Sequence, residues 1–261
     1  MNIQLRYQAM QSTGMADNVE GNIVSTELLA DLDPTETALV LVDTWGEHPI
    51  VSHCERTGSI VQMRIRPALE AARVAGITPI YAPSPHVAAR YPRWTHLAGI
   101  EELRPSVVAD DDWPPLAYRE LSEPYTSLRR APGELPLASV GRPERWHQVR
   151  TIHAAIAPTA DDVVIASGDQ LHRVLRDRRL VHLVYVGFAT NICIRFRDYG
   201  MRAMKDRGYR PILLRDATSG IETRETYDDF SITRSVLQDL ERWFFTASVD
   251  DFVVGCREIE T

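Results

Sequence analysis

The sequence predicts a single α/β domain over residues 1–261, with a doubly wound, mostly parallel, Rossmann-like sheet between two layers of helices. Short runs of aliphatic and β-branched residues recur along the chain, as expected for strands that are buried on both faces. Segments with the apolar spacing of helices separate these runs, and this alternation is typical of parallel βαβ units. The length and the 44% hydrophobic content suit one domain of this kind.

The first half of the chain supplies the first two expected strands. Residues 1–35 are polar and weakly periodic, and we expect an arm or a lead-in helix there. The run TALVLVD at 37–43 predicts a strand buried on both faces. An apolar stripe predicts a helix over 57–75, ended by Gly76 at the position that favours glycine. The run ITPIYA at 77–82 predicts the next strand.

The segment 83–150 interrupts the alternation. It is rich in proline, holds three tryptophans and the acidic run 110–112, and has little regular periodicity. A segment this long inside a compact domain is commonly functional when it is ordered. We therefore expect a long insertion, either a lid or wall of the site or a surface excursion with no chemical role.

The second half of the chain restores the alternation of strands and helices. The expected strands cover 162–166, 181–188, 210–216 and 251–254. The expected helices cover 169–177, 191–207 and a stretch from 226 to about 243, the last opened by Thr226 and Asp229 in a capping-box pattern.

The composition narrows the classes of partner. A formal net charge of -7 argues against a broad nucleic-acid interface, and no run approaches the length of a membrane span. The first 21 residues lack the apolar run of a signal peptide, so we expect a cytoplasmic protein. The three cysteines, Cys54, Cys193 and Cys256, fit a reducing compartment better than a disulfide framework. A small molecule is the expected ligand.

Two residues with reactive side chains stand at the expected ligand-binding edge of the sheet. Asp43 ends the first strand, and Cys193 follows the strand 181–188 and opens a helix that Thr190 or Asn191 can cap. A thiol in the first turn of a helix lies near the positive end of the helix dipole, which favours the thiolate. The alternative is a small buried hydrophobic residue, the usual role of a free cysteine.

The segment YVGFATNICI at 185–194 resembles the nucleophile motif of the isochorismatase-like cysteine hydrolases, which include nicotinamidases and N-carbamoylsarcosine amidohydrolases. ALVLVD at 38–43 resembles their first strand, which ends in the catalytic aspartate, and GYRPILLRD at 208–216 resembles the strand after the nucleophile. The resemblance covers roughly 36–82 and 160–245. It implies hydrolysis of a C–N bond in a small amide or carbamoyl compound, through a thioester on Cys193 and with Asp43 as acid and base.

The resemblance also implies a cis peptide between Phe188 and Ala189, with the N–H groups of Ala189 and Cys193 binding the oxyanion. Relatives commonly form dimers or tetramers, so a homo-oligomer is expected. Two rival functions stay open. One is vinyl-ether hydrolysis of the isochorismatase type, which needs no cysteine nucleophile, and the other is a non-catalytic ligand-binding or scaffold protein of the same fold.

The chain departs from the family pattern at the third catalytic residue. The family's lysine ends a strand that here reads VVIA and is followed by Ser167 and Gly168. The only lysine, Lys205, lies twelve residues after Cys193, about 18 Å along a continuous helix. An arginine, a histidine or a metal must therefore assist Asp43 and Cys193, or the usual chemistry is absent.

Several residues are candidates for that role and for binding the substrate. His153 is the catalytic candidate, because the family resemblance implies a histidine in a similar place in members that lack the usual sequence after the first strand. His48 and His53 are candidate ligands of a divalent metal such as zinc, although no cofactor is the leading expectation. Arg197, one turn below Cys193, can support the thiolate. The candidates for substrate binding are Trp45, His86, Tyr91, Trp94, Thr190 and Arg197.

Overall fold

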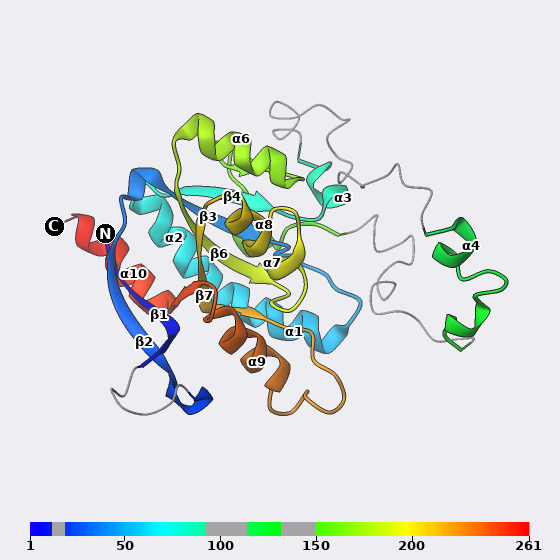
Figure 1. The fold of residues 1–261 in the computed structure, drawn as a ribbon. Coiled ribbons are helices and arrows are strands. Elements are labelled where there is room, and N and C mark those ends of the chain that lie inside the picture. Colours follow the sequence, from blue (N-terminus) through cyan, green and yellow to red (C-terminus); the bar gives the residue numbers. More distant parts are fainter. Residues whose placement is uncertain (12–18, 92–113, 132–149, 261) are drawn as a thin grey trace.

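The computed structural model describes residues 1–11, 19–91, 114–131 and 150–260. Its centre is an eight-stranded sheet in the order β2-β1-β8-β7-β6-β3-β4-β5 (Figure 1). The six strands from β8 to β5 are parallel, and β1 and β2 extend the sheet as an antiparallel pair. The strands are β1 Asn2–Met10, β2 Ile23–Asp31, β3 Thr37–Val42, β4 Thr78–Ala82, β5 Val163–Val164, β6 His182–Phe188, β7 Arg210–Ser219 and β8 Phe245–Ala247. The predicted α/β class is confirmed.

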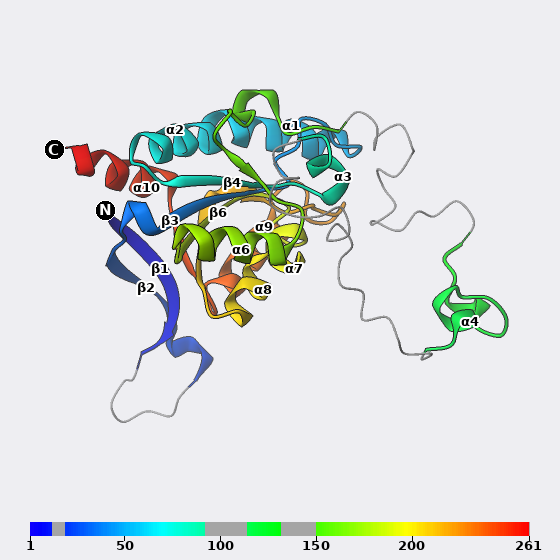
Figure 2. The same cartoon turned by 90° about the horizontal axis from the view of Figure 1, so that it is seen from above.

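Helices cover both faces of the sheet (Figure 2). They are α1 Val51–Ile60, α2 Arg66–Val74, α3 Pro85–Ala88, α4 Leu116–Arg119, α6 Gly168–Arg178, α7 Cys193–Phe196, α8 Met201–Asp206, α9 Ser231–Leu240 and α10 Val249–Arg257. Five residues of π-helix, Val61–Ile65, join α1 to α2. None of the helices in the described ranges is long and apolar enough to cross a membrane.

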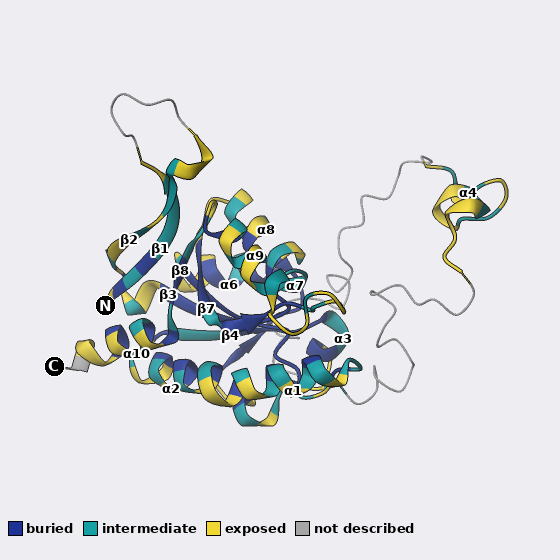
Figure 3. Cartoon of the chain, turned by 90° about the horizontal axis from the view of Figure 1, so that it is seen from below, coloured by how far each residue is buried: buried dark blue, intermediate teal, exposed yellow. Residues whose placement is uncertain are grey.

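Two hydrophobic cores lie on opposite faces of the sheet. Leu39 and Leu41 of β3 pack with Leu69 of α2 and Phe252 of α10, whereas Val40 packs with residues of α6 and α8. This follows from the two-residue repeat of a strand, which sends neighbouring side chains to opposite faces. Figure 3 shows the result, with buried strands between helices whose outer faces are exposed.

Three predicted elements were wrong. Within residues 1–35, β1 and β2 form an antiparallel pair instead of an arm or helix, and β1 pairs with β8 at Arg6 and Thr246. Residues 251–254 lie within α10, where Phe252 is buried and Asp251 is capped by Ser248; the last strand is β8. The helix expected over 191–207 is two short helices, α7 and α8, separated by 197–200.

Other boundaries moved by smaller amounts. The helix predicted at 57–75 begins at Val51, and α9 begins at Ser231 after a turn in which Asp229 accepts the Ser231 N–H. The insertion 83–150 contains α3 and α4 in its described part, and its proposed role as a lid stays a prediction because 92–113 and 132–149 lie outside the described residues.

Gly187 lets the end of β6 approach the end of β3. Its φ is +113°, and a Cβ atom there would lie 2.0 Å from the carbonyl oxygen of Val42. No side chain is compatible with that distance, and glycine adopts positive φ without steric cost. Because Val42 precedes Asp43, this close approach brings the loop after β6 beside the aspartate.

Candidate active site

Asp43 and Cys193 lie in one cavity at the carboxyl ends of β3 and β6. The cavity has a volume of about 380 Å³, which suits a small molecule. The Cys193 thiol lies close enough to the Asp43 carboxylate and to the Arg197 guanidinium for both charges to shift its pKa. The lining residues are Asp43, Trp45, His48, Ile50, Ser84, Arg150, Ala189, Ile192, Cys193, Arg197 and Ile221.

The Asp43 carboxylate is held by the residue that precedes α3. Its Oδ1 accepts hydrogen bonds from the N–H and the hydroxyl of Ser84, both at 2.6 Å. Asp43 has a φ of 44°, a left-handed conformation that aspartate tolerates better than most residues, and it is 2% exposed. The sheet and α3 therefore fix one oxygen of this carboxylate and leave Oδ2 toward Arg197.

Arg197 reaches the same carboxylate from the residue that follows α7. Its Nη2 lies 3.5 Å from Asp43 Oδ2 and donates to Ser84 Oγ at 2.9 Å. Burial is the largest single influence and acts to lower the pKa of Arg197, but Asp43, Tyr199 and Cys193 together outweigh it and raise that pKa above its ordinary value. Arg197 is thus a fixed cation beside both predicted catalytic groups. It leaves the helical conformation at this point, a break that the apolar pattern of 191–207 did not reveal.

The Cys193 thiol differs from the sequence-based expectation in its pKa. Burial, then the Asp43 charge, raise that pKa, whereas Arg197 lowers it only in part. The expected helix field is weak because α7 has four residues and its N-cap residue, Ile192, offers no side-chain cap. The resting thiol is therefore protonated, and the Asp43 carboxylate lies beside it.

The peptide between Phe188 and Ala189 is cis, as the family resemblance implied. The N–H of Ala189 lies close enough to the Cys193 sulfur to lower the pKa of the thiol. The two proposed helix caps have other partners: Thr190 bonds Thr218 through their hydroxyls at 2.7 Å, and the Asn191 side chain bonds the backbone of Ile221. Thr190 is fully buried and does not line the cavity, so it makes no substrate contact there.

His153 does not line the cavity. Its Nδ1 accepts the Ala155 N–H at 3.1 Å and caps the short 3-10 helix Ala154–Ile156. The backbone N–H of His153 donates to the Thr44 carbonyl at 2.8 Å, which fixes the chain next to Trp45. This ring has a local structural role, and we do not retain His153 as a catalytic residue.

His48 and His53 are buried beside each other, with ring centroids 5.1 Å apart. Burial is the main cause that lowers the pKa of His48 to about 4 and that of His53 to about 3. His48 Nδ1 accepts the Ile50 N–H, and His53 Nδ1 lies 3.1 Å from Arg56 Nη2. Among the residues that the structure describes, no group of three or more metal-binding side chains converges, so this pair does not fit the proposed metal site.

Among the described candidates for substrate binding, Trp45 and Arg197 line the cavity. Tyr91 uses its hydroxyl to accept the Ile152 N–H at 3.0 Å, and His86 lies in α3 outside the lining. Trp94 lies outside the described residues. The sequence analysis missed Ser84 and Arg150. Ser84 follows β4 by two residues, a place at the ligand-binding edge that a closer reading of the pattern identifies, whereas Arg150 gave no signal.

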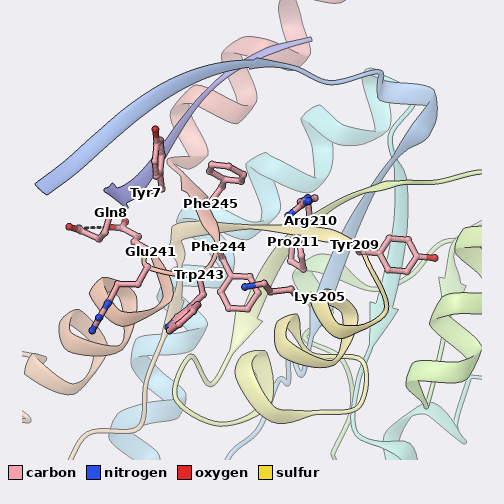
Figure 4. A pocket seen from close by; sticks show the side chains of 11 residues that line it. Tyr7, Gln8, Lys205, Tyr209, Arg210, Pro211, Glu241, Trp243, Phe244 and Phe245 are labelled. Carbon is pink, nitrogen blue, oxygen red and sulfur yellow. Dashed lines mark hydrogen bonds between the residues drawn. The ribbon is translucent and has the colours of Figure 1, made fainter. Parts of the chain in front are cut away.

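Lys205 belongs to a different cavity, of about 200 Å³, and is not the missing lysine. Its Nζ lies 5.2 Å from the ring centroid of Trp243 and 5.3 Å from that of Phe244 (Figure 4). Tyr7 of β1 and Glu241, which follows α9, line the same cavity. No residue of this second cavity lines the cavity of Asp43 and Cys193.

Comparison with known proteins gives a family match. The model of the isochorismatase domain matches residues 37–238. A cysteine hydrolase from Pseudomonas syringae pv. phaseolicola 1448A is similar in structure, with a TM-score of 0.53 at 19% identity over 87% of this chain and 95% of that one. An isochorismatase-like hydrolase from Alkaliphilus metalliredigens has a TM-score of 0.50 at 16% identity, over 85% and 97%. At such identities these structures support the fold alone. No curated protein matches the chain.

Proposed function

The chain belongs to the isochorismatase family of hydrolases, and on that premise we propose that it hydrolyses a C–N bond of a small amide or carbamoyl compound with Cys193 as nucleophile. The observation that carries the proposal is that the Cys193 thiol and the Asp43 carboxylate line one cavity and interact electrostatically. A nucleophile beside a base that can take its proton is the arrangement that acyl transfer requires.

The proposed reaction has two stages. In the first, Asp43 takes the thiol proton while sulfur attacks the carbonyl carbon, and the electrons of the C=O bond move onto its oxygen. The Ala189 and Cys193 N–H groups hold that oxyanion. When the C=O bond re-forms, the C–N bond breaks and the amine leaves with the proton from Asp43. In the second stage, Asp43 deprotonates a water that attacks the thioester, and the Cys193 sulfur leaves and recovers its proton.

In this proposal Arg197 performs the electrostatic role that a lysine has elsewhere in the family. It lies near the Cys193 sulfur and 3.5 Å from Asp43 Oδ2, and it carries a raised pKa, so it stays cationic throughout. A fixed positive charge stabilises the sulfur as it loses its proton. An arginine cannot exchange protons at neutral pH, so Asp43 carries every proton transfer.

The test is ammonia release from a panel of small primary amides and carbamoyl compounds, with intact-mass detection of an acyl group on the protein. We expect release from at least one compound and an adduct on Cys193. Cys193→Ala should abolish both and leave circular dichroism unchanged. Cys256→Ala is the matched control, because Cys256 lies in α10 outside the cavity lining.

Two outcomes would contradict the proposal. Turnover that survives in Cys193→Ala would remove the covalent step and favour chemistry without a thiol nucleophile, such as vinyl-ether hydrolysis. Binding of panel compounds without ammonia release or adduct would favour a ligand-binding protein that retained the fold.

We also propose that the protein forms a homo-oligomer, which gel filtration tests. The free cysteines suit a reducing compartment. We propose turnover without a cofactor, which metal analysis of the active protein tests.

A further inference from the structure

A second guanidinium, that of Arg150, lines the cavity and has no part in the proposed reaction. Its Nε is buried without a hydrogen-bond partner, and Arg150 makes no ion pair with the residues that the structure describes. Burial is the main cause that lowers its pKa, although an arginine keeps its charge near neutral pH. A half-buried cation without a counterion is costly, which points to an anion that is supplied from outside the chain.

The Arg150 guanidinium is held in place before any ligand binds. Its Cζ lies 5.3 Å from the Trp45 ring centroid, in a cation–π contact. The backbone next to it is tied to the segment after Asp43: Ile152 forms a β-bridge with Trp45, and the Gly46 N–H donates to the Thr151 carbonyl at 3.1 Å. Such preorganisation lowers the entropy cost of binding a ligand.

The charges around the cavity favour an anionic ligand. Among the residues that line the cavity, Asp43 is acidic, whereas Arg150 and Arg197 are both cationic. Cys193 is protonated at rest, and His48, with its pKa at about 4, is neutral near pH 7. Arg197 is engaged with Asp43, so the charge left over is that of Arg150.

We propose that Arg150 binds a carboxylate of the substrate and so selects its class, a small amide or carbamoyl compound that carries a carboxylate. This rests on the proposed function, because the reacting carbonyl must lie at Cys193 while the carboxylate lies at Arg150. A planar guanidinium can bind a carboxylate through two parallel hydrogen bonds. The apolar lining of Ile50, Ile192 and Ile221 suits the short carbon segment between the two groups.

The test compares the alkylation of Cys193 by iodoacetate and by iodoacetamide. The two reagents share the reactive carbon and differ in carrying a carboxylate or an amide. Rates at Cys193 are measured by peptide mass spectrometry in the wild-type protein and in Arg150→Gln, Arg150→Lys and Arg66→Gln. Arg66 pairs with Glu70 on the exposed face of α2 and serves as the control.

We expect Arg150→Gln to lower the ratio of the iodoacetate rate to the iodoacetamide rate by about tenfold or more, as loss of a charge-assisted contact predicts. Arg150→Lys should keep part of the ratio, Arg66→Gln all of it, and added salt should lower it in the wild type. If Arg150→Gln does not fold, the Arg150→Lys variant and the salt series still test the proposal.

The two proposals fail in different ways. If Cys193 is alkylated but the reagent ratio is the same in wild type, Arg150→Gln and high salt, then Arg150 binds no carboxylate and the proposed function stands. If neither reagent modifies Cys193 in the folded wild-type protein, the thiol is not an accessible nucleophile and the proposed function is overturned, together with the inference that rests on it.

Discussion

The cavity of Asp43 and Cys193 and the cavity of Lys205 both contain cations but differ in what surrounds them. At the carboxyl ends of β3 and β6, Arg197 faces the Asp43 carboxylate and the Cys193 thiol. In the second cavity, Lys205 lies over the rings of Trp243 and Phe244, with no cysteine in the lining. The difference shows that the position of a basic residue decides which groups surround it. Reactive side chains gather at the carboxyl ends of parallel strands, because those strands end there together.

The largest expected effect is that of Asp43→Asn. The amide keeps the shape of the side chain but cannot take the thiol proton, so turnover of any panel substrate should fall by about a thousandfold. Ammonia release measures this, and Asp177→Asn on the surface of α6 should leave the rate unchanged. A loss below about tenfold in Asp43→Asn would show that another base serves the first cavity.

A smaller loss is expected when the cation of the first cavity is removed. Arg197→Gln should lower kcat by about ten- to a hundredfold, because the charge beside Asp43 and the sulfur disappears. Arg197→Lys restores a positive charge and should recover part of the rate. Equal rates in the two variants would show that the charge of Arg197 is not what the reaction uses.

Acidification should destabilise the wall of the first cavity. The folded-state pKa values of His48 and His53, about 4 and about 3, lie below the usual 6.5. The unfolded chain therefore binds more protons than the folded chain in this range. The histidine contribution to the free energy of unfolding is full above about pH 6.5 and falls as the pH drops toward 4. The loss is about 1.4 kcal/mol per pH unit for each histidine.

Urea unfolding at a series of pH values between about 7 and 5 measures that slope. His53→Gln cannot be protonated and should flatten it, since Gln can still accept from Arg56. A slope that is the same in wild type and variant would mean that these rings are not the source of the pH dependence.

The smallest effect is expected in the second cavity. Lys205→Gln removes the cation from the rings of Trp243 and Phe244, and should cost about 1 kcal/mol or less in the free energy of unfolding. Turnover should not change. A loss of turnover comparable to that of Arg197→Gln would contradict the separation of the two cavities.

Local pattern was sufficient for the elements that are buried on both faces. The runs at 37–43, 77–82 and 181–188 were recognised because such strands are continuously apolar. Local pattern failed where pairing with a distant segment of the chain decides the structure. The polar residues of β1 and β2 form strands only because β1 pairs with β2 and with β8. Residues 251–254 have the apolar content of either a strand or a helix.

The sequence by itself determined the α/β class, the two strands that end near Asp43 and Cys193, and the absence of a lysine where the family carries one. Only the tertiary structure decided which cation lies beside Asp43. Arg197 reaches Asp43 because the helical conformation of α7 ends before it. Arg150 lies at the end of the segment 83–150, which has no regular pattern, and it lines the same cavity. Periodicity records which face of an element is buried, whereas the convergence of side chains from distant segments depends on how those elements pack.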